Sequence, residues 1–263
     1  IASQIFPMVA LTEIYRQADT SDIVVAAHAI SRGDVPVTRD DAGAEFMLIH
    51  ARSEEQVLEQ VLAQSKMLYQ ARVNFQVMSP RHSGTVGVTN INARLRDVIN
   101  PKRSGVQEMR LGPEVIREDD RIMIVRNDYE KDVFNGDVGK VQVLDRKAKE
   151  VVVKVHGPPI QYVRLAFREA ASFLRLAYCT TVHKMQGQEA DVIILPLVTG
   201  FSQQLQRNLL YTAITRAKKR VILVGHQDAL VRAILNNKQD ARNTLFLDRL
   251  RQNALDTKDS GLV

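Results

Sequence analysis

Apolar and polar positions in the first part of the chain alternate between helical and strand-like spacing. Apolar residues three or four positions apart mark helices, and short uninterrupted apolar runs mark buried strands. The pattern predicts helix, strand, helix, strand and helix in that order, over residues 21–33, 45–49, 53–69, 75–78 and 89–100. This alternation is typical of a parallel sheet with helices packed against it.

Polar and special residues mark the ends of these predicted helices. Ser21 precedes the first helix as an N-cap and Gly33 follows it as a stop. Ser53 and Gln56 form a capping-box pattern at the start of the second helix. Pro101 ends the third helix, because the residue before a proline is biased away from helical geometry.

The pattern changes between about residues 106 and 173. Short β-branched runs recur with no helical spacing between them, separated by turn signals at "NGD" (135–137), "DRKAK" (145–149) and "GPP" (157–159). Strands at such close and regular spacing predict a small antiparallel barrel inserted into the α/β domain.

Helix and strand spacing returns after the predicted insert. It predicts strands over 174–180, 191–197 and 220–225, and helices over 202–217 and 226–237. In the first of these helices we expect Leu205, Leu209 and Ile214 to face the sheet. The domain organisation is therefore expected to be residues 1–105 and 174–263 as two parts of one α/β domain, and residues 106–173 as the insert.

Composition adds little to this picture but excludes some classes. The chain has 263 residues, of which 45% are hydrophobic and 25% charged, as in ordinary globular proteins. No run approaches the roughly 18 apolar residues of a membrane span, and no basic-then-apolar leader is present, so no membrane partner is expected. The single cysteine, Cys179, cannot form an internal disulfide, which suits a buried side chain in a reducing, cytoplasmic setting. A net charge of +6 indicates a polyanionic partner only mildly.

Residues 180–189, "TTVHKMQGQE", form a polar loop between two apolar runs. Ligands of open parallel sheets bind beyond the carboxyl ends of strands, and we expect this loop to lead into a helix start that favours anions. Thr181 and His183 can contact phosphate or sugar, Gly187 permits close approach of backbone, and Glu189 can accept a hydrogen bond from a hydroxyl. An isolated polar loop of this kind is more often a capped, solvated turn.

Two further polar clusters allow both a structural and a functional interpretation. In "LLYTAITRAKKR" (209–220), Arg216 lies near a helix end, where it either complements the helix dipole or is aimed at a transferring phosphoryl group. In "SPRHSG" (79–84), Ser79 and Arg81 could hold a backbone phosphate, or form a surface turn.

Four segments occur in a fixed order: "LTEIYRQ" (11–17), "VMSPRHSGTVGVTNINARL", "YCTTVHKMQGQEADVIILPL" and "NLLYTAITRAKKRVILVG". In this order and spacing they resemble motifs IV, IVa, V and VI of superfamily 1 DNA helicases, most closely the RecD-like branch. "NDYEKDVFNGDVGKV" resembles the same branch, in which an SH3-like barrel is inserted into the second RecA-like domain. The resemblance extends over about residues 1–252. It implies a RecA-like (P-loop NTPase-type) parallel sheet with helices on both faces and an inserted SH3-like β-barrel.

The resemblance also implies roles at the nucleotide. Arg216 falls on the motif VI arginine finger, and Arg16 on the motif IV arginine that reaches the ATP phosphates, so both are expected to be catalytic. Gln17, next to Arg16, is expected at ATP. Gly187 and Glu189 fall on motif V positions near the γ-phosphate and ribose.

Roles at DNA follow in the same way. Thr181 and His183 fall on motif V positions near the DNA backbone, and Ser79 and Arg81 fall on motif IVa positions there. One departure is Met185, where the family often has Ser.

In this family two RecA-like domains enclose ATP, and the first carries the Gly-rich P-loop and the magnesium ligands. The sequence contains no G-x-x-x-x-G-K-[ST] and no acidic pair after a suitable strand, so no metal ligands are expected in this chain. The resemblance therefore implies the second domain of a longer helicase. Its expected partners are ATP with Mg²⁺, an N-terminal RecA-like domain of the same protein and single-stranded DNA, with travel 5′ to 3′ and no activity of the chain alone.

Two alternatives remain open on the sequence. The chain could be a non-catalytic RecA-like scaffold or DNA-binding subunit of a helicase–nuclease or conjugation complex. The presence of both arginines and the motif V glutamate favours the enzyme. A nucleotide-fold enzyme acting on small molecules has no acid/base pair or metal cluster to support it.

Overall fold

The computed structural model describes residues 21–39, 41, 43–157, 159–201, 204–237, 245–246, 248–250 and 252. Arg16 and Gln17 lie outside the described residues. The chain divides into two compact units, Ile1–Arg16 with Lys238–Val263, and Gln17–Asn237, and the second unit contains both large sheets. In the described part of the chain, no helix is long and apolar enough to cross a membrane.

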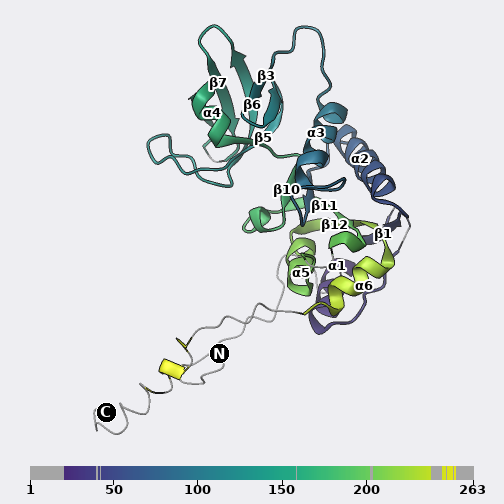
Figure 1. The fold of residues 1–263 in the computed structure, drawn as a ribbon. Helices are drawn as coiled ribbons and strands as arrows, with labels where there is room; N and C mark the ends of the chain where they lie inside the picture. Colours follow the sequence, from purple (N-terminus) through teal and green to yellow (C-terminus); the bar gives the residue numbers. More distant parts are fainter. Residues whose placement is uncertain are drawn as a thin grey trace. The chain divides into compact units, whose positions relative to one another are not determined.

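A five-stranded parallel sheet forms the centre of the second unit (Figure 1). Its strands are buried on both faces, which is why each reads as a nearly continuous apolar run. In spatial order they are β1 (Phe46–His50), β12 (Ala217–Gly225), β11 (Ala190–Leu197), β2 (Phe75–Ser79) and β10 (Cys179–Thr181), all paired in parallel.

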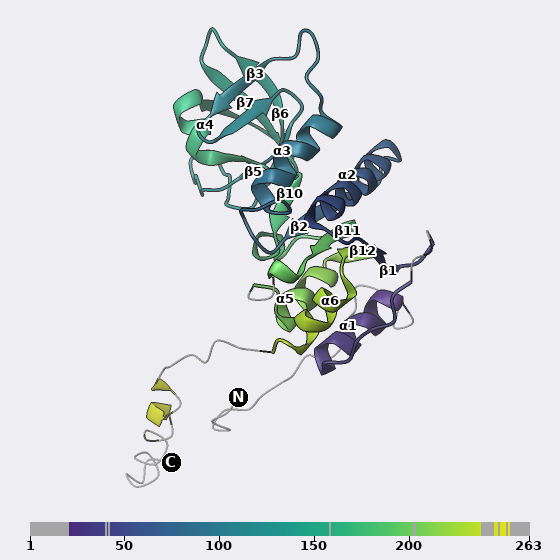
Figure 2. The same ribbon diagram turned by 45° about the vertical axis from the view of Figure 1, so that its right-hand side comes forward.

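Helices cover both faces of this sheet (Figure 2). One face carries α2 (Glu54–Gln70) and α3 (Val88–Ile99). The other carries α1 (Asp22–Arg32), α5 (Arg207–Ile214) and α6 (Gln227–Leu235). The predicted α/β architecture is confirmed.

The predicted helix caps are also present. The Ser21 hydroxyl caps α1, and Gly33 ends that helix with a φ of +95°, a left-handed conformation that glycine adopts without a Cβ clash. At α2 the Ser53 hydroxyl accepts from the Gln56 backbone N–H at 3.2 Å. The Gln56 side chain in turn accepts from the Arg52 N–H at 2.8 Å, so both partners of the predicted capping box satisfy free donors.

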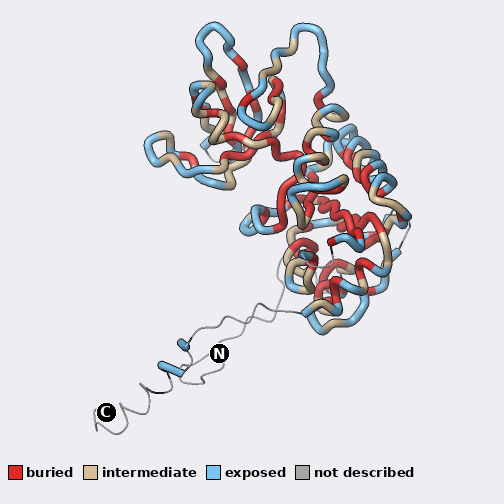
Figure 3. Tube along the Cα trace, viewed as in Figure 1, coloured by how far each residue is buried: buried red, intermediate tan, exposed pale blue. Residues whose placement is uncertain are grey.

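The insert is an antiparallel barrel with its own core. Its main sheet has five strands in the order β8 (Gln161–Ala166), β7 (Glu150–Val155), β6 (Val138–Asp145), β5 (Arg121–Ile124) and β9 (Leu174–Leu176). A hairpin of β3 (Glu108–Leu111) and β4 (Glu114–Arg117) and the short helix α4 (Phe167–Phe173) complete it. Buried residues follow the strands of both sheets, and exposed residues follow the turns of the barrel (Figure 3).

The predicted strand over 174–180 is two strands in different sheets. Leu174–Leu176 pairs with β5 in the barrel, whereas Cys179–Thr181 pairs with β2 in the parallel sheet. Hydrophobic spacing could not show this break, because both halves are buried and Ala177 and Tyr178 between them are buried as well.

The predicted helix over 202–217 is shorter than expected. A short 3-10 helix, η2 (Thr199–Phe201), precedes it, and α5 itself begins at Arg207 and ends at Ile214. Leu210 rather than Leu209 is fully buried against the sheet. Residues from Ala217 onward belong to β12, because they pair with the start of β11.

Candidate functional site

The polar loop after β10 runs between the two ends of the parallel strands. We call the side of the sheet where the strands end the carboxyl edge, and the side where they begin the amino edge. The loop leaves the carboxyl edge at Thr181, which pairs with Ser79, the last residue of β2. It returns at the amino edge, at Ala190, which pairs with Ala217, and both are first residues of their strands. Between these points lies one short 3-10 turn, η1 (His183–Met185), and no α-helix. The expected helix start at this loop is therefore wrong, and the loop instead connects two edges.

Arg216 and Glu189 lie together at the amino edge of the sheet. Glu189 directly precedes β11 and Arg216 directly precedes β12, and the Ala190 N–H donates to the Arg216 carbonyl at 3.1 Å. The Arg216 guanidinium donates to the Thr212 carbonyl at 3.2 Å and to the Thr215 hydroxyl at 3.4 Å. These contacts hold the half-buried guanidinium against the last turn of α5.

An ion pair and a glycine with positive φ lie near Arg216 at the amino edge. The Glu189 carboxylate forms an ion pair with the ammonium group of Lys218, and both side chains are partly exposed. Gly187 has a φ of +83°, and a Cβ placed there would meet no atom within 4 Å. The structure thus brings Gly187, Glu189 and Arg216, three residues predicted to act at ATP, to one edge.

Ser79 and Thr181, predicted at DNA, end neighbouring strands at the opposite edge, but their side chains are buried. The Ser79 hydroxyl donates to the Val86 carbonyl at 2.8 Å and accepts from the Arg81 N–H at 3.4 Å. The Thr181 hydroxyl accepts from the Lys184 N–H at 3.4 Å. This placement suits residues that shape the two loops rather than side chains that reach into solvent.

Arg81 connects the loop after β2 to the turn after β11. Its Nε donates to the Ser83 carbonyl at 3.2 Å and one terminal nitrogen donates to the Gly200 carbonyl at 3.4 Å. The guanidinium carbon lies 5.4 Å from the centre of the Phe201 ring, within the range of a cation–π contact. Since the described acceptors are neutral, these contacts orient the positive charge without neutralising it.

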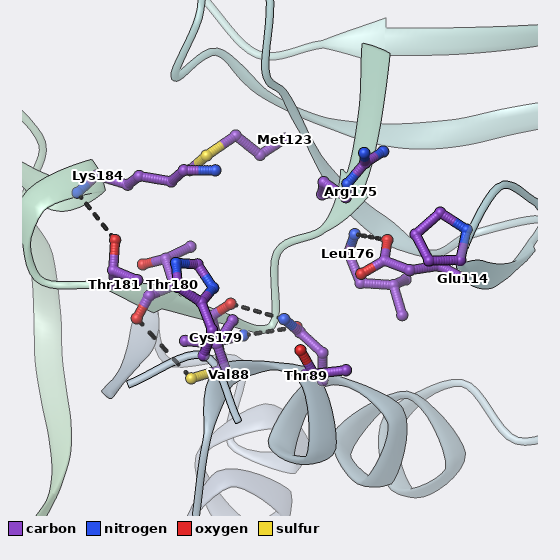
Figure 4. Close-up of a pocket in the computed structure, with 13 residues that line it drawn as sticks. Val88, Thr89, Glu114, Met123, Arg175, Leu176, Cys179, Thr180, Thr181 and Lys184 are labelled. Atoms are coloured by element: carbon purple, nitrogen blue, oxygen red, sulfur yellow. Dashed lines mark hydrogen bonds between the residues drawn. The ribbon is translucent and has the colours of Figure 1, made fainter. Parts of the chain in front are cut away.

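A cavity of about 210 Å³ lies beside the carboxyl edge (Figure 4). Its lining includes Thr89 of α3 and Thr181 and Lys184 of the polar loop. The barrel adds Glu114 of β4 and Arg175 of β9. Figure 4 shows Lys184 beside Thr181, joined to it by a hydrogen bond from its backbone N–H, and Arg175 farther along the space, near Leu176 and Glu114.

The charged groups of this cavity affect one another. Burial, and then the nearby Arg175, lower the pKa of Lys184. Burial raises the pKa of Glu114, whose carboxylate accepts from the Leu176 N–H at 2.8 Å. Sequence reasoning missed Lys184 and Arg175; Lys184 lies inside the polar loop and could have been found there, whereas Arg175 is brought close only by the insert.

His183 lies on the other side of the loop, exposed, in a wider hollow of about 730 Å³ between the loop and the barrel. Gly187 and Glu189 line the same hollow, as do Arg121 and His156 of the barrel. No group of three or more His, Cys, Asp or Glu side chains in the described residues could hold a metal ion.

A five-stranded parallel sheet with helices on both faces and an inserted barrel is the architecture of a RecA-like domain with an insert. Residues 176–224 match the UvrD-like helicase C-terminal domain, and residues 91–155 match the ATP-dependent RecD-like DNA helicase SH3 domain. The chain therefore carries a UvrD-like helicase C-terminal domain with a RecD-like SH3 domain, which confirms the resemblance to RecD-like helicases.

Curated relatives agree with this assignment. The ATP-dependent RecD2 DNA helicase of Deinococcus radiodurans is 31% identical over 259 residues, which cover 95% of this chain and 33% of that protein. The RecBCD enzyme subunit RecD of Mycobacterium tuberculosis is 35% identical over 115 residues, 43% of this chain and 19% of the subunit. The chain thus spans about a third or less of the length of these relatives.

Solved structures show the same fold at low identity. A Pif1 helicase from Bacteroides, in complex with ADP-AlF3 and single-stranded DNA, has a TM-score of 0.54 at 16% identity. The match covers 96% of this chain and 57% of the Pif1 chain. A structure of Pif1 helicases on forked duplex DNA has a TM-score of 0.51 at 17% identity, with 96% and 55% covered.

Proposed function

We propose that this chain is the C-terminal motor domain of an ATP-dependent DNA helicase, which couples ATP hydrolysis to movement along single-stranded DNA, 5′ to 3′, and to duplex unwinding. The observation that carries the proposal is the loop between β10 and β11. Thr181, a candidate DNA residue, begins it at the carboxyl edge, and Glu189, a candidate nucleotide residue, ends it at the amino edge, while His183 lines the same hollow as Gly187 and Glu189. The similarity to the RecD2 helicase over nearly the whole chain supports the same activity.

Residues at the amino edge fit the groups of a nucleotide. The Arg216 guanidinium can stabilise the charge that develops on a transferring phosphoryl group. The Glu189 carboxylate can accept from a ribose hydroxyl, and the open backbone at Gly187 can approach a phosphate. ATP with Mg²⁺ supplies the free energy of the cycle. Its phosphate cradle and magnesium ligands belong, in this proposal, to an N-terminal RecA-like domain of the same protein, because this sequence has no P-loop.

The carboxyl edge fits the backbone of a single strand. Lys184 and Arg175 face a cavity that Thr181 also lines, and cations that contact phosphate give binding without sequence preference. When Arg216 must reach a phosphate held by another domain, hydrolysis requires closure of the two domains. Because the same loop reaches both edges of the sheet, closure of the two domains around ATP changes the position of the residues that contact single-stranded DNA.

The test is Arg216→Ala in the full protein that contains this chain. We expect DNA-stimulated ATP hydrolysis to fall by about 10³-fold or more, while nucleotide binding is retained. Arg164→Ala, an exposed arginine on the barrel paired with Glu150 at 3.8 Å, is the matched control and should leave turnover unchanged. Near-normal turnover of the Arg216 variant would contradict the proposed function.

A further inference from the structure

One side chain connects the polar loop to the barrel. Gln188 lies between Gly187 and Glu189, and its Nε2 donates a hydrogen bond of 2.6 Å to the backbone carbonyl of Gly136, in the turn between β5 and β6. Both residues line the hollow between the loop and the barrel. The contact therefore bridges two segments that are 52 residues apart in the sequence.

The acceptor is held firmly by the barrel. The Gly136 N–H donates to the Ile124 carbonyl at 2.9 Å, and the Ile124 N–H donates to the Asp137 carbonyl at 2.8 Å. The Asp137 carboxylate accepts from the Phe134 N–H at 2.8 Å, which closes the turn. Gly136 itself has a φ of +107°, so this turn geometry depends on glycine. A carbonyl fixed in this way is a rigid anchor.

The donor side is a loop that packing fixes only in part, since Val182 and Met185 are buried but Gly187 is exposed. Gly187 has positive φ and open space around its Cβ direction, so its backbone can reorient at low cost. The Gln188 N–H donates to the Met185 carbonyl at 3.0 Å, which orients the backbone on one side of the side chain. The bond to Gly136 adds to the Glu189–Lys218 ion pair and to the bond from the Ala190 N–H to the Arg216 carbonyl in fixing the direction in which Gly187 and Glu189 are presented.

The barrel is attached to the parallel domain elsewhere by a buried cluster. The Asp120 carboxylate, which is fully buried, accepts from the Asn100 side chain at 2.8 Å and from the Tyr178 hydroxyl at 2.9 Å. Arg121 donates to the Phe75 carbonyl at 3.1 Å at the start of β2. These contacts hold β5, and therefore the turn that carries Gly136, in place against the parallel domain.

We propose that Gln188 is a positioning residue through which the barrel holds the motif V loop, so that Gly187 and Glu189 are presented to the nucleotide. The proposal rests on the proposed function, since it assigns Gln188 to the nucleotide site of the same helicase. It gives the insert a role in ATP use, in addition to any contact with DNA.

Hydrogen–deuterium exchange in the full protein tests the physical contact. Gln188→Ala removes the side-chain amide, and Gln188→Glu keeps its size but places a carboxylate against a carbonyl. Both should raise amide exchange in peptides that span 186–190 by about three- to tenfold, the effect of losing one partly buried hydrogen bond. Gln161→Ala, which removes a glutamine bonded to Asp132 of the barrel at 3.1 Å, should leave exchange in the loop unchanged. Unchanged exchange in both Gln188 variants would overturn the proposal.

Steady-state kinetics separate positioning from simple stabilisation. In both Gln188 variants the KM for ATP should rise about three- to tenfold with kcat less affected, while the melting temperature stays close to that of the parent protein. Normal KM and kcat despite faster exchange would also overturn the proposal, because the bond would then be structural alone. A parent protein without any ATPase would instead defeat the proposed function, and the exchange experiment would still decide whether Gln188 anchors the loop.

Discussion

At the scale of single residues, the candidate DNA edge contains two kinds of side chain. Ser79 and Thr181 are buried and bonded within their loops, whereas Lys184 and Arg81 are more exposed and carry charge. A phosphate contact needs a donor that can meet the ligand, so the charged residues are the better candidates for direct contact. Spacing in the sequence could identify all the loops, but it could not distinguish inward from outward hydroxyls.

Lys184→Ala should weaken single-strand binding equally for unrelated sequences. One phosphate contact fewer reduces the slope of log affinity against log salt by about 0.7–1. Binding of fluorescent oligonucleotides at several salt concentrations measures this slope. Lys147→Ala, at an exposed position in the turn between β6 and β7, is the control and should leave the slope unchanged. An unaltered slope in the Lys184 variant would exclude a phosphate contact at this side chain.

At the scale of elements, β10 is an edge strand whose outer edge is covered by a side chain. The Asn92 carboxamide on α3 donates to the Cys179 carbonyl at 2.8 Å and accepts from the Cys179 N–H at 2.9 Å. Asn92 thereby supplies the two hydrogen bonds that a further strand would have made. This contact fixes α3 against the strand that ends in Thr181, and so positions the start of the polar loop.

Asn92→Leu should destabilise the fold by about 2–4 kcal/mol, because it leaves a buried N–H and a buried carbonyl of Cys179 without partners. Urea denaturation followed by circular dichroism measures the change in the free energy of unfolding. Arg94→Ala, on the exposed side of the same helix, should change it by less than about 0.5 kcal/mol. A similar small change in the Asn92 variant would show that water replaces the carboxamide.

Local signals predicted most elements, and tertiary pairing decided the rest. The caps at Ser21, Gly33 and Ser53 act through contacts within a few residues, so sequence alone could place α1 and α2. The division of 174–180 between two sheets depends on partners in β5 and β2, 50 or more residues away. The same limit applies to Gln188, whose partner Gly136 lies in a turn of the barrel 52 residues away in the sequence.

At the scale of the whole molecule, ion pairs help to join the barrel to the parallel domain. Arg117 on β4 donates to the Asp97 carboxylate and the Asn100 carbonyl, both at 2.9 Å, at the end of α3. It also donates to Glu108 at 2.7 Å, and Lys102 donates to the same carboxylate at 2.6 Å. These two hydrogen bonds, that of Lys102 first, lower the pKa of Glu108 from 4.5 to about 2.

The Glu108 carboxyl should make stability depend on pH in the acid range. Its pKa is lower in the folded than in the unfolded protein, so its contribution is fully present above about pH 4.5 and is lost as the pH falls towards 2. Glu108→Gln should therefore lower the melting temperature at pH 7, and the difference from the parent protein should shrink towards pH 3. Calorimetry across this range measures it.

Glu150→Gln is the control, since the Glu150 carboxylate lies 3.8 Å from the exposed Arg164 and is itself exposed. Its difference from the parent protein should be small at every pH. A Glu108 difference that does not change between pH 7 and pH 3 would contradict the assigned pKa.

The loop between Thr181 and Ala190 has a final consequence for how this protein can vary. Substitution can alter the chemistry at either sheet edge separately, because the side chains concerned lie at different points of the loop. An insertion or deletion cannot alter one edge separately. Both ends of the loop are fixed by strand register, so a change in its length moves every residue between them. Homologous chains should therefore vary more in the residue types of this loop than in its length.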